Sequence, residues 1–159
     1  MGGAVTRTKD EMNIAEVISM DHRKVDTLFM EIEKTDDPQK LQEFFGQLYK
    51  DLSVHAEAEE QIVYPAIRSY YSDTQELYDE QAEMKQMLAH IKALRPSATD
   101  EFKAQIEQLK IAVKAHVKEE ENDMFPYIRR NMSEAQMEQM ATQFKAAKST
   151  LQQELASMS

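Results

Sequence analysis

The chain contains two copies of an unusual helical pattern, and this repeat limits the folds it can adopt. Residues 41–67 and 102–128 align without a gap, and both carry His-x-x-x-Glu-Glu followed by an aromatic residue and proline. In each copy, the histidine and the first glutamate fall on a stripe that is otherwise apolar at helical spacing. The two polar pairs are His55 with Glu59 and His116 with Glu120. We therefore expect two related helices that both turn polar side chains toward one core.

Helix-start signals and prolines divide the chain into five expected helices. With only three glycines and four prolines, the sequence can be helical almost throughout. Capping patterns begin at Asn13, Asp37, Asp73, the Ser-Ala-Thr-Asp stretch at 97–100, and Ser133. Because the connections are short, consecutive helices are expected to be antiparallel neighbours. The predicted fold class is all-α: an up-down-up-down four-helix bundle with a shorter C-terminal fifth helix.

The chain is expected to form one domain with two appended segments. Residues 1–12 are predicted to be a flexible N-terminal segment, and residues 13–131 form the bundle. Residues 132–159 contain the fifth helix, whose apolar residues recur at helical spacing. This helix is expected to pack on its own bundle or on a partner, with a homodimer through this helix as the specific alternative.

Composition excludes several classes of function. The net charge of -10 argues against nucleic acid and against anionic membrane surfaces, which both require a basic patch. Without cysteine, the chain has no disulfide, no thiolate chemistry and no sulfur-ligated zinc or iron. The sequence has no apolar run long enough to span a bilayer and no signal peptide, so a cytoplasmic location is expected.

Three of the four histidines interrupt apolar stripes, and their heights along the bundle indicate whether they belong together. Counted from the turns at one end, His22 lies about 14 residues away, and His55 and His116 about 19, which places them within roughly two helical turns. His90 lies only about 7 residues from that end, too far from the others to join them. Two carboxylates buried beside the three histidines require a compensating charge, and a metal ion supplies one.

The candidate metal ligands are His22, His55, Glu59, His116 and Glu120. Imidazole and carboxylate without sulfur suit iron or manganese, with zinc and copper also possible. No histidine is preceded by the Glu-x-x-His motif of ferritin-type proteins, and the His-Glu-x-x-His motif of zinc proteases is absent. We expect iron, as two ions or one, with manganese or zinc as alternatives.

These motifs make the sequence resemble the hemerythrin-like, or HHE cation-binding, family over about residues 14–130. The resemblance is carried by Asp21-His22 and by the two His-x-x-x-Glu-Glu units in the expected order. It implies a non-haem di-iron centre. The implied ligands are His22 and His55 on one iron, His116 on the other, and Glu59 and Glu120 as bridges.

The third expected helix departs from the family pattern. Alignment places Met84 where the family has a histidine, and Gln81 lies one turn earlier, where some members have another. Neither residue is a good substitute, because a thioether is soft and a neutral amide oxygen is a weak ligand. The site is therefore expected to hold one metal, to fill the gap with an exogenous ligand, or to draw in Glu80, Glu83 or Gln81.

Four residues beside the motifs have weaker expected roles. Tyr64 and Tyr127 are interpreted first as core or rim residues, with a role near the metal as the second choice. Glu60 and Glu121 directly follow the candidate ligands, so they are candidates for orienting the histidines through hydrogen bonds.

Two functions from different classes follow. The first is a non-haem iron protein that binds or reacts with a small ligand such as O2, peroxide or NO, with reactivity favoured over reversible O2 carriage by the gap in the third helix. The alternative is a metal- or redox-responsive regulatory module without turnover, acting through a partner. The sequence does not decide whether the protein is an enzyme.

Overall fold

The computed structural model describes residues 12–95 and 99–158, and every regular element within these ranges is helical. Residues 1–11 of the predicted N-terminal segment, and residues 97–98 of the predicted cap, lie outside the described residues. The elements are α1 (Ile14–Lys34), α2 (Pro38–Ala58), η2 (Glu59–Val63), α3 (Tyr64–Ile67), α4 (Thr74–Leu94), α5 (Asp100–Glu119), η3 (Glu120–Met124), α6 (Phe125–Asn131) and α7 (Glu134–Met158). Here η2 and η3 are π-helical turns.

The helices begin where capping chemistry allows. Asn13 and Glu16 form a reciprocal capping box, with both side chains 3.0 Å from the other residue's backbone nitrogen. The Asp37 side chain accepts a hydrogen bond from the Gln39 amide at the start of α2. At Asp73 the position is as predicted, but the side chain makes no capping bond. Two further caps are Thr99 for α5 and the Ser133–Gln136 pair for α7.

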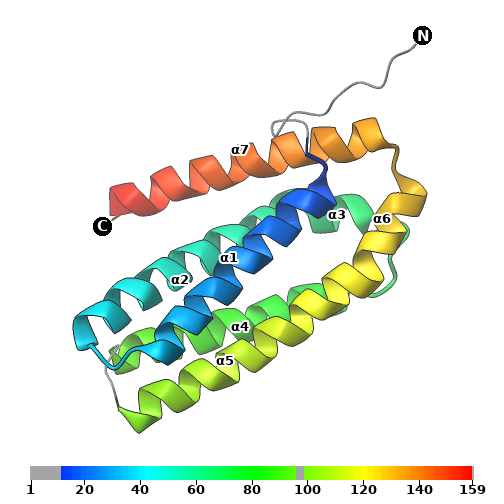
Figure 1. Ribbon diagram of the computed structural model, residues 1–159. Coiled ribbons are helices and arrows are strands. Elements are labelled where there is room, and N and C mark those ends of the chain that lie inside the picture. Colours follow the sequence, from blue (N-terminus) through cyan, green and yellow to red (C-terminus); the bar gives the residue numbers. More distant parts are fainter. Residues whose placement is uncertain (1–11, 96–98, 159) are drawn as a thin grey trace.

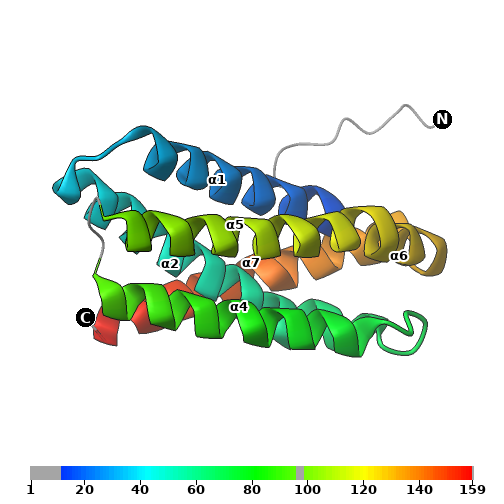
Figure 2. The same cartoon turned by 90° about the horizontal axis from the view of Figure 1, so that it is seen from below.

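The four long helical segments alternate in direction, which confirms the predicted up-down-up-down bundle (Figure 1). Because α2, η2 and α3 follow one another without a break, as do α5, η3 and α6, two of these segments are continuous rods. The C-terminal helix α7 has 25 residues, fewer than either rod, and packs against α1, α2 and η2. Figure 2 shows the bundle from below, with α7 (orange to red) beyond α2.

The core is divided into two apolar clusters. One gathers residues around Ile18, Tyr64 and Phe144, and the other gathers residues around Phe29, Leu48 and Phe102. The two clusters meet near residues 19–24 of α1, near His55 and Glu59 on the rod that begins with α2, and near His116 and Glu120 on the rod that begins with α5. The buried polar residues of the molecule concentrate in this intervening layer.

Within residues 12–95 and 99–158, no helix combines the length and the hydropathy that a membrane span requires.

Candidate metal centre

Three histidines and two glutamates enter one layer of the bundle from three directions. His22 lies on α1, while His55 and His116 lie on the last turns of α2 and α5. Glu59 and Glu120 are the first residues of η2 and η3, and both are 0% exposed. The structure therefore brings all five sequence-predicted residues together, and their role as ligands stays a prediction.

Each glutamate opens a π-helical turn that leads into an aromatic residue and proline. In the first unit, the Tyr64 amide donates to the carbonyl of Glu59, five residues back, and Pro65 follows directly. Proline has no N–H to donate and crowds the carbonyl four residues before it, so one wider turn lets the rod continue. The second unit repeats this with Glu120, Phe125 and Pro126. The proline thus fixes where each carboxylate lies.

The inward-facing nitrogen of each histidine lies against a carboxylate. The His55 Nε2 to Glu59 Oε1 distance is 3.2 Å, and the His22 Nε2 to Glu120 Oε1 distance is 3.1 Å. The other oxygen of Glu120, Oε2, lies 3.3 Å from His116 Nε2. Glu120 therefore contacts histidines of α1 and α5 with different oxygens.

The outward-facing nitrogen of each histidine contacts a second carboxylate, supplied by another helix. The Nδ1 pairs are His22 with Glu121 at 2.7 Å, His55 with Asp21 at 2.8 Å, and His116 with Glu80 at 2.7 Å. Metal-binding histidines are typically held in this way, because a carboxylate behind the ring fixes its orientation and strengthens it as a ligand. All three rings are thus oriented with Nε2 toward the centre.

Some polar atoms at the centre have no partner among the described residues. His55 Nε2, Glu59 Oε2 and Gln81 Oε1 are buried without a hydrogen bond, and the 3.2 Å contact between His55 and Glu59 lacks hydrogen-bond geometry. A buried polar atom without a partner destabilises a fold by about 1–3 kcal/mol. A cation would satisfy these atoms, so the donor set fits a metal ion.

The two central carboxylates alter the pKa values of the histidines. Burial lowers the pKa of His55, but Glu59 and Asp21 outweigh it and raise the pKa to about 10. Burial likewise lowers the pKa of His116, but Glu120 and Glu80 raise it to about 11. Without a metal, therefore, these histidines hold protons where a cation would otherwise balance the carboxylates.

The pKa values of the two central carboxylates shift in opposite directions. Burial and the neighbouring charge of Glu120 raise the pKa of Glu59. Burial acts the same way on Glu120, but His116 and His22 outweigh it and hold its pKa well below the usual range. The charge at the centre is thus concentrated on Glu120.

A family model described as the hemerythrin HHE cation-binding domain matches residues 13–128. The chain belongs to this family. A group of four of its residues, His22, His55, Glu59 and Glu120, has ligand atoms within 4.8 Å of one another and could hold a metal ion. Family and geometry thus agree on a cation-binding domain.

Two proteins from other organisms are similar to this chain. A protein of Nostoc sp. (strain PCC 7120) named DNA nickase is 57% identical over 159 residues, covering 98% of this chain. The chain spans only 45% of the length of that protein. An uncharacterized hemerythrin-like protein of Schizosaccharomyces pombe is 25% identical over 140 residues, which cover 85% of this chain and 68% of that protein. No solved structure matches this chain.

Helix α4 carries Gln81 and Met84 at the positions where members of the family have histidines. Gln81 is 1% exposed, and its amide nitrogen lies 2.7 Å from Glu59 Oε1. Met84 is buried in the adjoining apolar cluster, Glu80 holds His116 from behind, and Glu83 is exposed. The amide of Gln81 therefore reaches the centre, and the carboxylate of Glu83 does not.

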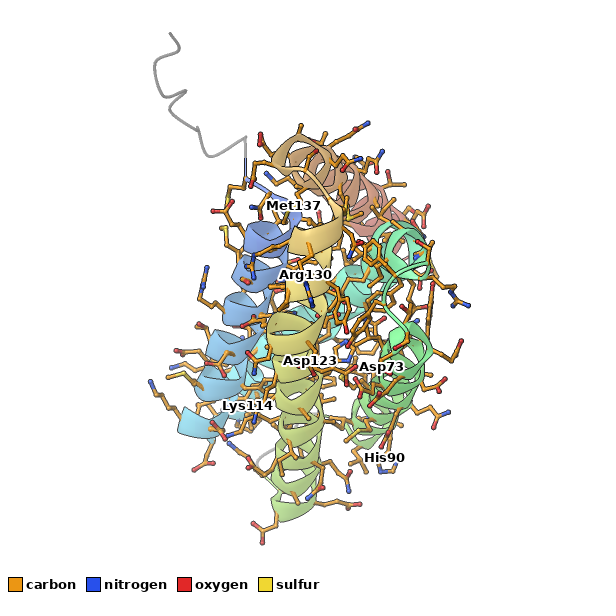
Figure 3. The ribbon with its side chains drawn as sticks, turned by 90° about the vertical axis from the view of Figure 1, so that its right-hand side faces the viewer. Asp73, His90, Lys114, Asp123, Arg130 and Met137 are labelled. Carbon is orange, nitrogen blue, oxygen red and sulfur yellow. The ribbon has the colours of Figure 1, made fainter. Side chains whose placement is uncertain are left out.

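Of the other candidate residues, one contacts a histidine of the centre and the rest lie away from it. Glu121 contacts His22 as the sequence suggested, whereas Glu60 pairs with Lys85 at 2.9 Å. His90 is exposed and lies on the outer side of α4 (Figure 3). Tyr127 lies at the rim with 37% exposure.

Tyr64 lies closer to the centre than its sequence interpretation as a core or rim residue indicated. Its ring is 0% exposed, and its hydroxyl lies 2.6 Å from Glu120 Oε2 and 3.1 Å from His116 Nε2. Burial and the two carboxylates raise its pKa well above the usual value. The available signal was its place directly before Pro65, where the second unit has Phe125.

Helix α7 also reaches the centre, although it lies beyond the residues that the family model matches. Lys148 contacts both oxygens of Asp21, at 2.7 and 2.6 Å, and Asp21 holds His55. The ring of Phe144 packs edge-on against His55, with centroids 5.5 Å apart. Sequence reasoning assigned this helix to packing or to a partner, because nothing in the sequence pairs Lys148 with Asp21.

A cavity of about 30 Å³ adjoins the three histidines. Its remaining walls are mostly apolar and include Val25, Met84, Val113 and Val117. This volume accommodates about one water molecule.

Proposed function

We propose that the chain binds redox-active iron, as two ions or one, through His22, His55, Glu59, His116 and Glu120, and that the loaded site reacts with O2, peroxide or NO. The observation that carries this proposal is that His55 Nε2 and Glu59 Oε2 are buried without a hydrogen-bond partner among the described residues, and that His55 lines the cavity. Imidazole and carboxylate ligands without sulfur suit iron and manganese. Bound iron would supply redox chemistry and a coordination position for a small ligand.

The chain's own residues would prepare the site for this chemistry. Glu121, Asp21 and Glu80 hold the three rings so that Nε2 is directed inward. Glu120 carries negative charge between two histidines, which offsets the charge of a cation there. Met84 and the surrounding valines exclude bulk water, which strengthens every electrostatic interaction in the layer.

A groove between α1 and α5 supports access for a small ligand. The groove has a volume of about 420 Å³ and shares His22, Val25, Val113 and Val117 with the inner cavity. Those four side chains therefore separate the groove from the centre. A diatomic or peroxide molecule could enter by small side-chain motions at this partition, and a larger substrate could not.

The direct test is to load the metal-free protein with ferrous iron without oxygen and then mix it with NO, peroxide or O2. We expect a change in the iron absorption spectrum that is fast and saturable, together with peroxide consumption above that of free iron. The His55→Ala variant should lose both responses, whereas His90→Ala, on the outer side of α4, should keep them. A response of wild type no greater than that of free iron would contradict the proposal.

The 57% identity to the Nostoc protein favours a second candidate, metal-dependent nicking of DNA. The acidic net charge of -10 opposes it, and the chain spans only 45% of that relative. The test is to incubate supercoiled plasmid with the iron-loaded protein, with and without catalase. Nicked circles that form with catalase present, and do not form with His55→Ala, would support this candidate. Nicking that catalase abolishes would instead indicate peroxide released into solution.

A further inference from the structure

The surroundings of the Tyr64 hydroxyl are unusual for a buried phenol. Its oxygen lies 2.6 Å from Glu120 Oε2, 3.3 Å from Glu59 Oε1 and 3.1 Å from His116 Nε2. The amide nitrogen of Gln81 lies 2.7 Å away and donates toward it. The hydroxyl has one proton and can donate to only one of the two carboxylates, so two carboxylates, an imidazole and an amide crowd around a single phenol oxygen.

These distances also fit atoms that share one ion. Ligand atoms about 2.1 Å from a metal and about 90° apart lie roughly 3 Å from each other. The oxygens of Tyr64 and Glu120 and the Nε2 of His116 form a triangle with sides of 2.6, 3.1 and 3.3 Å. A single ion in front of this triangle would contact all three atoms.

The His116 side of the centre is also the side that lacks ligands. On the other side, His22 and His55 both face the carboxylates, with ring centroids 5.2 Å apart. Beside His116 there is no second histidine among the described residues, and Gln81 occupies the facing position on α4. The Tyr64 oxygen lies where another ligand is needed.

The internal repeat shows that the hydroxyl is not required by the backbone. Phe125 occupies the equivalent position before Pro126, and its π-helical turn has the same hydrogen-bond pattern as that before Pro65. An aromatic ring alone therefore satisfies the turn. The oxygen of Tyr64 is an addition found in one unit only, and it is directed at the centre.

We propose that Tyr64 is a metal ligand, binding through its phenolate oxygen the ion on the His116 side, together with Glu120. This proposal rests on the proposed function of iron binding. On coordination, the O–H bond breaks, an oxygen–metal bond forms, and the proton passes to solvent, with no change of oxidation state. The Gln81 amide would donate a hydrogen bond to the phenolate, and the phenolate adds one negative charge that compensates for the absent histidine.

Phenolate bound to ferric iron gives a broad visible charge-transfer absorption, and this property provides the test. The metal-free protein is loaded with iron, oxidised, and examined by absorption and resonance Raman spectroscopy as wild type, Tyr64→Phe and Tyr71→Phe. Tyr71 is the matched control, because it is also buried and its hydroxyl has no hydrogen-bond partner among the described residues. Wild type and Tyr71→Phe should show the visible band and tyrosine ring vibrations, and Tyr64→Phe should show neither.

The outcomes separate this inference from the proposed function. If wild type takes up iron but its spectrum matches that of Tyr64→Phe, Tyr64 is not a ligand, and iron binding by the other residues stands. If wild type takes up no iron, both proposals fail. Should Tyr64→Phe fold poorly, ring-deuterated tyrosine in the wild-type protein decides the matter, because the enhanced vibrations must shift if tyrosine binds the iron.

Discussion

The two repeated units share a backbone and differ in their surroundings. In both, a histidine precedes a glutamate by one turn, and a π-helical turn leads into proline. Yet His55 is held by the buried Asp21, which Lys148 neutralises, whereas His116 is held by the partly exposed Glu80. The repeat thus sets where the ligand positions lie, and the neighbouring helices set their charge.

The carboxylates differ in the same way. Glu120 has both oxygens engaged, by His22 on one side and by His116 and Tyr64 on the other. Glu59 retains a buried oxygen with no hydrogen bond from any described residue. Equivalent positions in an internal repeat therefore need not be equivalent in charge or in binding strength.

The largest expected effect is on the stability of the metal-free protein. Glu120→Gln would leave protonated histidines buried without their carboxylate, and breaking such a buried pair costs about 3–5 kcal/mol. Glu59→Gln should cost less, because burial and the neighbouring charge of Glu120 already disfavour a charge on Glu59. Urea unfolding of both variants measures the difference, and equal losses would contradict the asymmetry.

The next effect concerns metal affinity and helix α7. In Lys148→Met, His55 alone balances Asp21, so the proton on His55 should be held more tightly than in wild type. A metal must displace this proton, and we expect affinity to fall about 10-fold or more. Lys145→Met, an exposed lysine on the same helix, is the matched control and should bind as wild type does. Titration calorimetry with ferrous or zinc ions measures both, and unchanged binding by Lys148→Met would remove α7 from the site.

The pH dependence should have opposite signs with and without metal. The pKa values of about 10 for His55 and about 11 for His116 lie above the unfolded value of about 6.5. These groups therefore stabilise the metal-free fold fully below about pH 6.5, and this contribution is lost as pH rises toward 10–11. Metal must displace the same protons, so its stabilising effect should grow with pH. Thermal unfolding from pH 6.5 to 9.5 tests both trends, and parallel curves would contradict them.

The smallest expected effect on metal affinity concerns the residues that directly follow Glu59 and Glu120. Glu121→Gln should weaken metal binding several-fold, because Glu121 holds His22 but is 37% exposed on its side chain. Glu60→Gln at the equivalent position should leave binding unchanged, since Glu60 pairs with Lys85. The same calorimetric titration compares the two. Equal losses would mean that surface charge, and not contact with the histidine, controls affinity.

The bundle fold and the layer that holds the histidines and glutamates could be predicted from the sequence, because both depend on spacing along single helices. Capping residues such as Asn13 and Ser133 mark helix starts, and the heights of His22, His55 and His116 require only the rise per residue. The family resemblance supplied the expected order of the motifs. All of this information comes from the sequence of each single helix and from its length.

The contacts between helices were harder to predict, because they depend on how each rod is rotated about its axis. The direction of Tyr64 relative to Glu59 depends on the π-helical turn between them, which has more residues per turn than an α-helix. The inward position of Gln81, and the contact of Lys148 with Asp21, depend on packing between elements far apart in the chain. The aromatic-proline repeat was the one available signal for Tyr64.

The measurement that tests the central claim most directly is the metal content per chain after expression in iron-replete medium, compared with thermal unfolding before and after removal of the metal. We predict one to two iron ions per chain, and at 1,000 times the dissociation constant the bound metal should add about 4 kcal/mol to the free energy of unfolding. Wild type that carries no stoichiometric metal and unfolds identically with and without added iron would contradict the account.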